Sequence, residues 1–163
     1  MENMKQELNY IEILINSLLK KEIILKQIIE KNELQKDLAT ASKFEYESFE
    51  QLYDEKGKLI AELNLLDSGF ESVFERVKDT LVNHKDIYKN EIEKLQKLIR
   101  SVTELSMEIE VSERRNKELM EKATSSMRGE VKTARATNKA AVDYYNNMAK
   151  INVVDPQFMD KKK

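Results

Sequence analysis

The chain contains almost no residues that would interrupt a helix. Pro156 is its only proline, and its three glycines stand at positions 57, 69 and 129. Elsewhere, apolar residues recur every three or four positions for tens of residues, which is the spacing of one face of an α-helix. Such stripes must be covered by other helices, so the sequence predicts an all-α protein built from long helices.

The first predicted helix covers about 3–35 and is the most apolar part of the chain. Its apolar stripe is wide, so we expect this helix to contact at least two neighbours. The same width leaves a homodimer open. Charged residues such as Lys20, Lys21 and Glu22 interrupt it too often for a membrane span. The seam of this helix is Met4, Leu8, Ile11, Ile15, Leu18, Glu22, Leu25 and Ile29.

Two further helices are predicted at about 42–82 and 86–127. Ser42 and Glu45 have the spacing of a capping box, which predicts the start of the second helix. Its apolar spacing continues in register through Gly69, so we expect one helix, with a bend at Gly69 left open. The two helices have similar lengths and a short connection. They therefore predict a long antiparallel hairpin, with a shorter first helix packed along part of it.

Polar residues occupy the far end of the third seam, at Ser112 and Asn116. A buried polar residue at such a position often fixes the register of packed helices. The alternative is that this end is left weak because a partner completes it. Glu113 and Lys117 stand four residues apart in the favourable order, so we assign them to the solvent face as a surface pair.

The last part of the chain differs from the rest, which divides the sequence into a helical bundle at 1–127 and a C-terminal arm at 128–163. Residues 1–125 carry 20 basic and 26 acidic side chains, whereas residues 126–163 carry 8 basic and 4 acidic ones. The arm has helical spacing but small side chains, so it buries little apolar area by itself. Its end, 155–163, is expected to be disordered.

Two interpretations of 130–150 stay open. It can fold back as a fourth bundle helix, or it can become helical on a partner protein. Tyr and Met suit an interface because they bury a large area adaptably. Four basic residues are too few to favour a nucleic acid or a membrane surface as the partner. The candidate partner-binding residues are Val131, Ala134, Asn138, Ala141, Tyr144, Tyr145 and Met148.

The residues needed for catalysis or cofactor binding are scarce. The chain has no cysteine, and His84 is its only histidine, placed at a predicted turn. A di-iron bundle site needs two Glu-x-x-His motifs, and phosphate binding usually has a glycine-rich loop. We therefore expect no enzyme activity, no metal and no cofactor. The start of the chain does not have the pattern of a signal peptide, and together with the lack of cysteine this fits the cytoplasm.

Over about residues 5–150 the chain resembles the flagellar export chaperones of the FlgN family. The resemblance is carried by Leu98, Ile99 and Leu105, by RNKELM at 115–120, and by the run 138–148. It implies a small cytoplasmic helical protein that binds a hook-filament junction protein before type III export. It also implies that a C-terminal amphipathic segment engages this client. The alternative from another class is a structural coiled-coil adaptor or tether with no export client.

Overall fold

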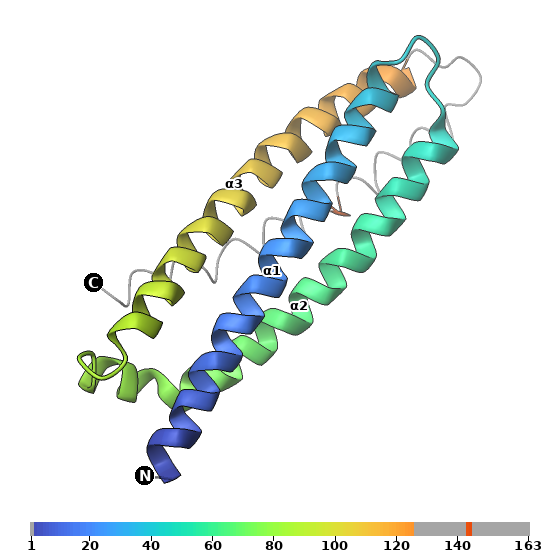
Figure 1. The fold of residues 1–163 in the computed structure, drawn as a ribbon. Helices are drawn as coiled ribbons and strands as arrows, with labels where there is room; N and C mark the ends of the chain where they lie inside the picture. The colour runs from blue at the N-terminus through green and yellow to red at the C-terminus, as the bar shows by residue number, and fades with distance from the viewer. Residues whose placement is uncertain (1, 126–142, 145–163) are drawn as a thin grey trace.

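The computed structural model describes residues 2–125, 143 and 144, with side chains from residue 4 onward. Three long helices make up most of this part of the chain: α1 (Glu2–Thr40), α2 (Tyr46–Asn83) and α3 (Lys89–Ser125) (Figure 1). No strand occurs in the described residues. The predicted all-α fold class is therefore confirmed. The arm residues 126–142 and 145–163 lie outside the described residues, so their predicted helix and disorder are not tested.

α1 is longer than the sequence analysis predicted, because it continues past residue 35 to Thr40. Its last turns are held by a small apolar cluster in which Leu38 and Ala39 pack around buried Phe49 of α2 and Met120 of α3. With 39 residues α1 matches the 38 of α2 and the 37 of α3. It therefore runs along the whole bundle rather than part of it.

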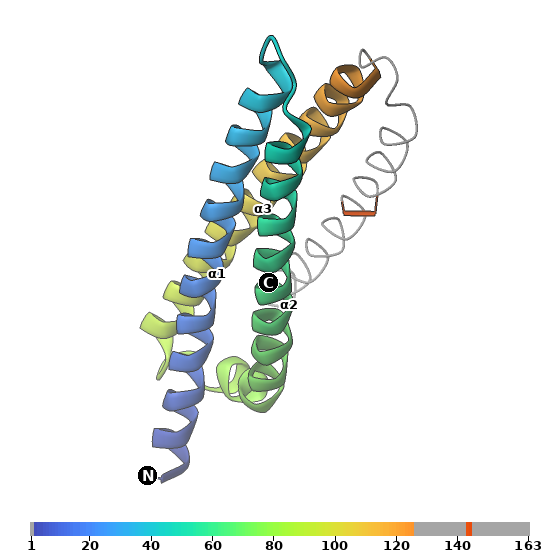
Figure 2. The ribbon, with the colours of Figure 1, turned by 90° about the vertical axis from the view of Figure 1, so that its right-hand side faces the viewer.

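α1 is also the centre of the packing. It runs parallel to α3 and antiparallel to α2, and it lies against both (Figures 1 and 2). Its extensive backbone contacts are with these two helices, whereas α2 and α3 are not packed extensively on each other. α2 and α3 are consecutive and antiparallel, as the predicted hairpin requires, but each packs on α1 rather than closely on the other (Figure 1). The physical reason is the wide apolar stripe of α1, which offers separate faces to two neighbours.

With the exception of Ile24, the buried positions of α1 follow a strict alternation of three and four residues. This spacing is that of a coiled-coil seam, and it continues through polar residues that the predicted seam did not include. Leu14, Lys21 and Leu25 are thus equivalent in position although one of them is charged. The series is Ile11, Leu14, Leu18, Lys21, Leu25, Ile28, Asn32 and Gln35.

The start of α2 is not fixed by the predicted capping box. Glu45 is the N-cap residue in extended backbone, and it makes no side-chain cap hydrogen bond. The Phe44 and Phe49 rings instead lie 5.6 Å apart between centroids. These two residues flank the cap at the positions of a hydrophobic staple, which fixes the angle at which the chain enters the helix.

α2 is one uninterrupted helix through Gly69, as predicted. An added Cβ at Gly69 would meet nothing within 4 Å. Glycine is therefore not required there by any close approach. At the other end of α2, His84 is the exposed C-cap residue, and its backbone N–H donates to the carbonyl of Thr80. None of the described helices is both long and apolar enough to cross a membrane.

Candidate functional site

One of the seven predicted partner-binding residues lies in the described part of the chain, and it is buried. Tyr144 is 5 % exposed, while its neighbour Asp143 is exposed. The six others lie outside the described residues: Val131, Ala134, Asn138, Ala141, Tyr145 and Met148. Tyr144 is therefore the one predicted partner-binding residue whose contacts the described part of the chain shows.

The side chain of Tyr144 lies between α2 and α3 and contacts both. Its ring centroid is 4.7 Å from that of Tyr53, and the Lys56 Nζ lies 4.5 Å from it. The second distance is within the range of a cation–π interaction. The Tyr144 hydroxyl donates to Glu113 Oε1 at 3.3 Å. We call these four residues the Tyr144 site.

A buried ion pair forms the floor of this site. Lys56 Nζ lies 2.7 Å from Glu113 Oε1, and the two side chains are 0 % and 3 % exposed. Lys56 also donates to Asn32 Oδ1 of α1 at 2.7 Å. A single ammonium group thus joins all three helices. Removing one partner of such a pair costs far more than a surface ion pair does, because the other charge stays buried.

Two further hydrogen bonds made by polar side chains join α1 to α3 beside this ion pair. The Asn32 side-chain amide donates to Ser112 Oγ at 2.7 Å. The Asn116 side-chain amide donates to the backbone carbonyl of Asn32 at 2.9 Å. We call the five residues the polar layer: Asn32, Lys56, Ser112, Glu113 and Asn116. Because Asn116 is fully buried and hydrogen-bonded between two helices, its geometry fits the register interpretation.

Burial acts on both charges of the pair. It lowers the pKa of Lys56 to about 8, against the opposing attraction of Glu113. It raises the pKa of the Glu113 carboxyl, against the opposing attraction of Lys56 and the hydrogen bond from Tyr144. Tyr53 is also affected, since burial and then Asp143 raise the pKa of its hydroxyl. Burial thus favours the neutral form of each group, and the charge of the partner opposes this by favouring the charged form.

One oxygen of Glu113 remains without a hydrogen bond. Oε2 is buried and has no partner in the described structure. The contacts of this carboxylate with the Lys56 ammonium and the Tyr144 hydroxyl both converge on Oε1. No three His, Asp or Glu side chains of the described residues gather in a way that could hold a metal. The arrangement therefore suits recognition of a side chain by hydrogen bonding and aromatic contact.

The sequence analysis identified Tyr144 but not the residues that receive it. Lys56 was given no role by the sequence analysis. Glu113 was assigned to a surface pair with Lys117, and this was wrong, because Glu113 is buried against Lys56. The available signal was a lysine and an asparagine, Lys56 and Asn32, that continue the three- and four-residue spacing of the apolar stripes and so need a buried partner.

Comparisons with protein-family models, with curated proteins and with solved structures found no match to this chain.

Proposed function

We propose that this protein binds a helical segment of a partner protein and holds it as a chaperone does, with the segment at about 130–150 as the binding element. Two observations support this proposal. The described part of the chain is a helical bundle held mainly by packing seams. Tyr144, an aromatic anchor of the C-terminal segment, sits in a site made of charged and aromatic side chains.

The burial of Tyr144 is the observation that carries the proposal, because it implies an exchange. The ring is covered on the bundle, so a partner that uses the same ring must first draw it out of the Tyr144 site. That release uncovers the Lys56–Glu113 pair. The free energy with which the Tyr144 ring docks on the bundle is therefore subtracted from the free energy of client binding. The C-terminal segment would thus be held on the bundle until a client of sufficient affinity replaces this contact.

The resemblance described above makes a secreted flagellar subunit of the hook-filament junction type the first client to test. We propose the cytoplasm as the place where this binding occurs. The expected complex contains one client for each chaperone, because each chain has one C-terminal segment.

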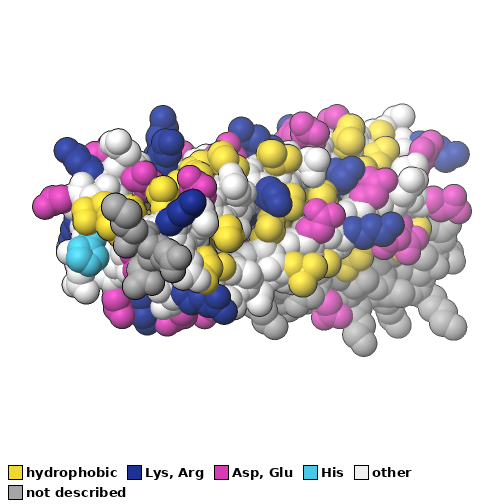
Figure 3. Space-filling view, turned by 60° about the horizontal axis from the view of Figure 1, so that its bottom comes forward, with side chains coloured by type: hydrophobic (Ala, Val, Ile, Leu, Met, Phe, Trp, Pro, Cys, Tyr) yellow, Lys and Arg dark blue, Asp and Glu magenta, His cyan; other side chains and the backbone are white. Residues whose placement is uncertain are grey.

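The structural adaptor or tether is the second candidate, and exposed apolar residues favour it. Ile23 of α1 is 58 % exposed and Leu65 of α2 is 76 % exposed. Together with Ile24 and Leu66 they line a shallow groove of about 510 Å³ on the outside of the bundle. Hydrophobic side chains also lie scattered among charged ones on the face shown in Figure 3. Such residues would be covered if copies of the chain associated along their length.

Capture from solution tests the proposal. The full chain, Tyr144→Phe and a chain ending at residue 129 are mixed with the purified hook-filament junction subunit, and complex mass is measured by light scattering. We expect a one-to-one complex with the full chain and with Tyr144→Phe, and none with the shortened chain.

Two results would contradict the chaperone proposal. One is equal capture by the full and the shortened chain, which would place the binding face on the helices. The other is the absence of any complex together with self-association that Leu65→Asp abolishes, which would favour the tether. Leu65→Asp is a suitable probe because Leu65 is exposed, so the substitution should leave the fold intact.

A further inference from the structure

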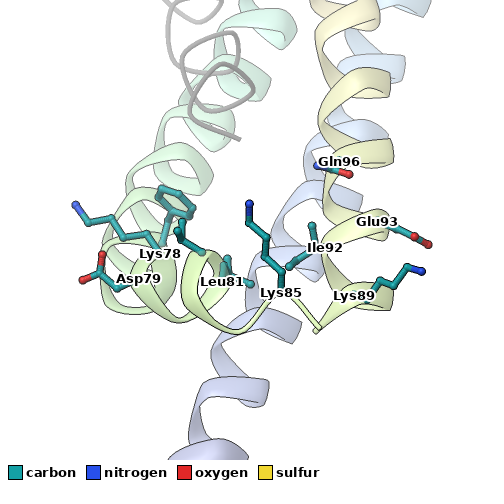
Figure 4. Close-up of a pocket in the computed structure, with 10 residues that line it drawn as sticks. Lys78, Asp79, Leu81, Lys85, Lys89, Ile92, Glu93 and Gln96 are labelled. Carbon is teal, nitrogen blue, oxygen red and sulfur yellow. The ribbon is translucent and has the colours of Figure 1, made fainter. Parts of the chain in front are cut away.

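A second site lies at the end of the bundle where α2 leads into α3, away from the Tyr144 site. It is a pocket of about 420 Å³, which is within the roughly 300–1,000 Å³ typical of ligand pockets. Its wall is apolar where the two helices face each other, with Leu81 of α2 opposite Ile92 of α3 (Figure 4). Phe74 and Val82 complete this apolar wall.

Three lysines stand around the pocket, and their positions differ. Lys85 rises between the two helices, whereas the ammonium groups of Lys78 and Lys89 point away on either side (Figure 4). Lys78 is already paired with Glu75 at 2.7 Å. None of the described residues pairs with the Lys85 ammonium. The pocket therefore presents one cation above an apolar wall.

The acidic residues at the pocket do not cancel this charge. The carboxylate of Glu93 points outward from α3 near Lys89, and Asp79 lies beside Lys78 on α2 (Figure 4). Both acidic side chains are thus on the outer flanks, and Lys85 is the charged group between the helices. A ligand that fills the pocket would bring its own negative charge to Lys85.

The surrounding helices also restrict the kind of ligand. Their backbone N–H and C=O groups are used within the helices, so the walls offer no edge to an extended peptide. The backbone groups of an extended peptide buried there would remain unpaired, and each would cost free energy. An alkyl chain has no such groups, and it gains free energy from apolar contact alone.

We propose that this pocket binds an amphiphilic carboxylate, a single carboxylate on an unbranched alkyl chain. Lys85 holds the carboxylate by a charge-assisted hydrogen bond, and Phe74, Leu81 and Ile92 contact the chain. This ligand site is independent of the proposed binding of a protein client. It would make the end of the bundle sensitive to free fatty carboxylates.

The test is titration of the full chain with sodium decanoate below its micelle concentration, followed by backbone amide NMR. We expect saturable shifts at residues 74–96 and not at the polar layer. Lys85→Met should weaken decanoate binding about tenfold, because it removes a hydrogen bond to a charged group. The matched control Lys89→Met should change the affinity for decanoate by less than about twofold, because an exposed charge contributes little.

Decanol separates the role of charge from that of the chain. Its binding should be weaker than that of decanoate in the wild-type protein and should not change in Lys85→Met. Val82→Trp, at an exposed position of the wall, should block both ligands. Absence of saturable shifts at residues 74–96 would overturn the proposal, and so would equal losses in the Lys85→Met and Lys89→Met variants.

Discussion

Lys56→Met should destabilise the protein far more than the same change combined with Glu113→Gln. In the single variant the Glu113 carboxylate keeps its buried position but loses the ammonium 2.7 Å away. Asn32 Oδ1 loses its donor at the same time. Breaking a buried pair in this way costs about 3–5 kcal/mol. This is a large part of the roughly 5–15 kcal/mol that stabilises a typical domain.

In the double variant the buried charge is gone. A glutamine at position 113 can still accept from Tyr144, and its amide can donate to Asn32. We therefore expect a stability within about 2 kcal/mol of wild type, since neutral replacement of a buried pair is often close to neutral. Urea unfolding followed by circular dichroism gives the three free energies of unfolding. A chain of this length loses roughly 2–4 °C of Tm per kcal/mol, so Lys56→Met should melt roughly 10 °C below wild type.

The pH dependence of Lys56→Met provides a further check. Burial raises the pKa of Glu113 in the folded state, so the folded protein binds a proton more tightly than the unfolded chain. The contribution of Glu113 to the free energy of unfolding is therefore present at acid pH, and it is lost as the pH rises through the pKa of Glu113 in the folded state. The difference in the free energy of unfolding between wild type and Lys56→Met should therefore become smaller as the pH falls. A cost below about 1 kcal/mol at neutral pH would refute the reasoning, because it would mean that Glu113 reaches water.

The remaining predictions address packing, helix propensity and titration. Leu63→Asp should unfold the protein, because Leu63 is fully buried, while Leu105→Asp at a half-buried position should lower the melting temperature less. Gly69→Ala should add about 0.5–1 kcal/mol to the free energy of unfolding, since its Cβ would meet nothing; no gain would indicate a bend that needs glycine. Tyr144→Ala should cost about 3 kcal/mol and Tyr144→Phe about 1 kcal/mol in urea unfolding. Nitrogen-detected NMR should show the Lys56 ammonium titrating with a pKa of about 8, and an ordinary lysine value would contradict its burial.

Helical periodicity predicted the class of fold and most of the core. The buried residues Ile11, Leu18 and Leu25 of α1 are seam positions of the first predicted helix. The continuity of α2 through Gly69 was predictable for the same reason, since the register of apolar residues is kept across it. Spacing along one helix is a local property, and local properties determine which face is buried.

The pairing between helices was not predictable in the same way. Spacing places Glu113 on a face but does not say which helix covers that face, so Lys117 and Lys56 were equally available as partners. The central position of α1 depends on how much area each helix pair buries, which is a property of the whole bundle. At the start of α2 two signals competed, and the contact of Phe44 with Phe49 prevailed over the capping box.

Fluorine NMR of the Tyr144 ring tests the central claim most directly. The full chain is labelled with fluorotyrosine, and the Tyr144 signal is assigned by its loss in Tyr144→Phe. In the free protein the signal should shift when Lys56 is replaced by Met, because the ring lies against that ammonium. Addition of the client should move the signal to a new position as the ring leaves the Tyr144 site. A signal that is unchanged both by Lys56→Met and by the client would contradict the account.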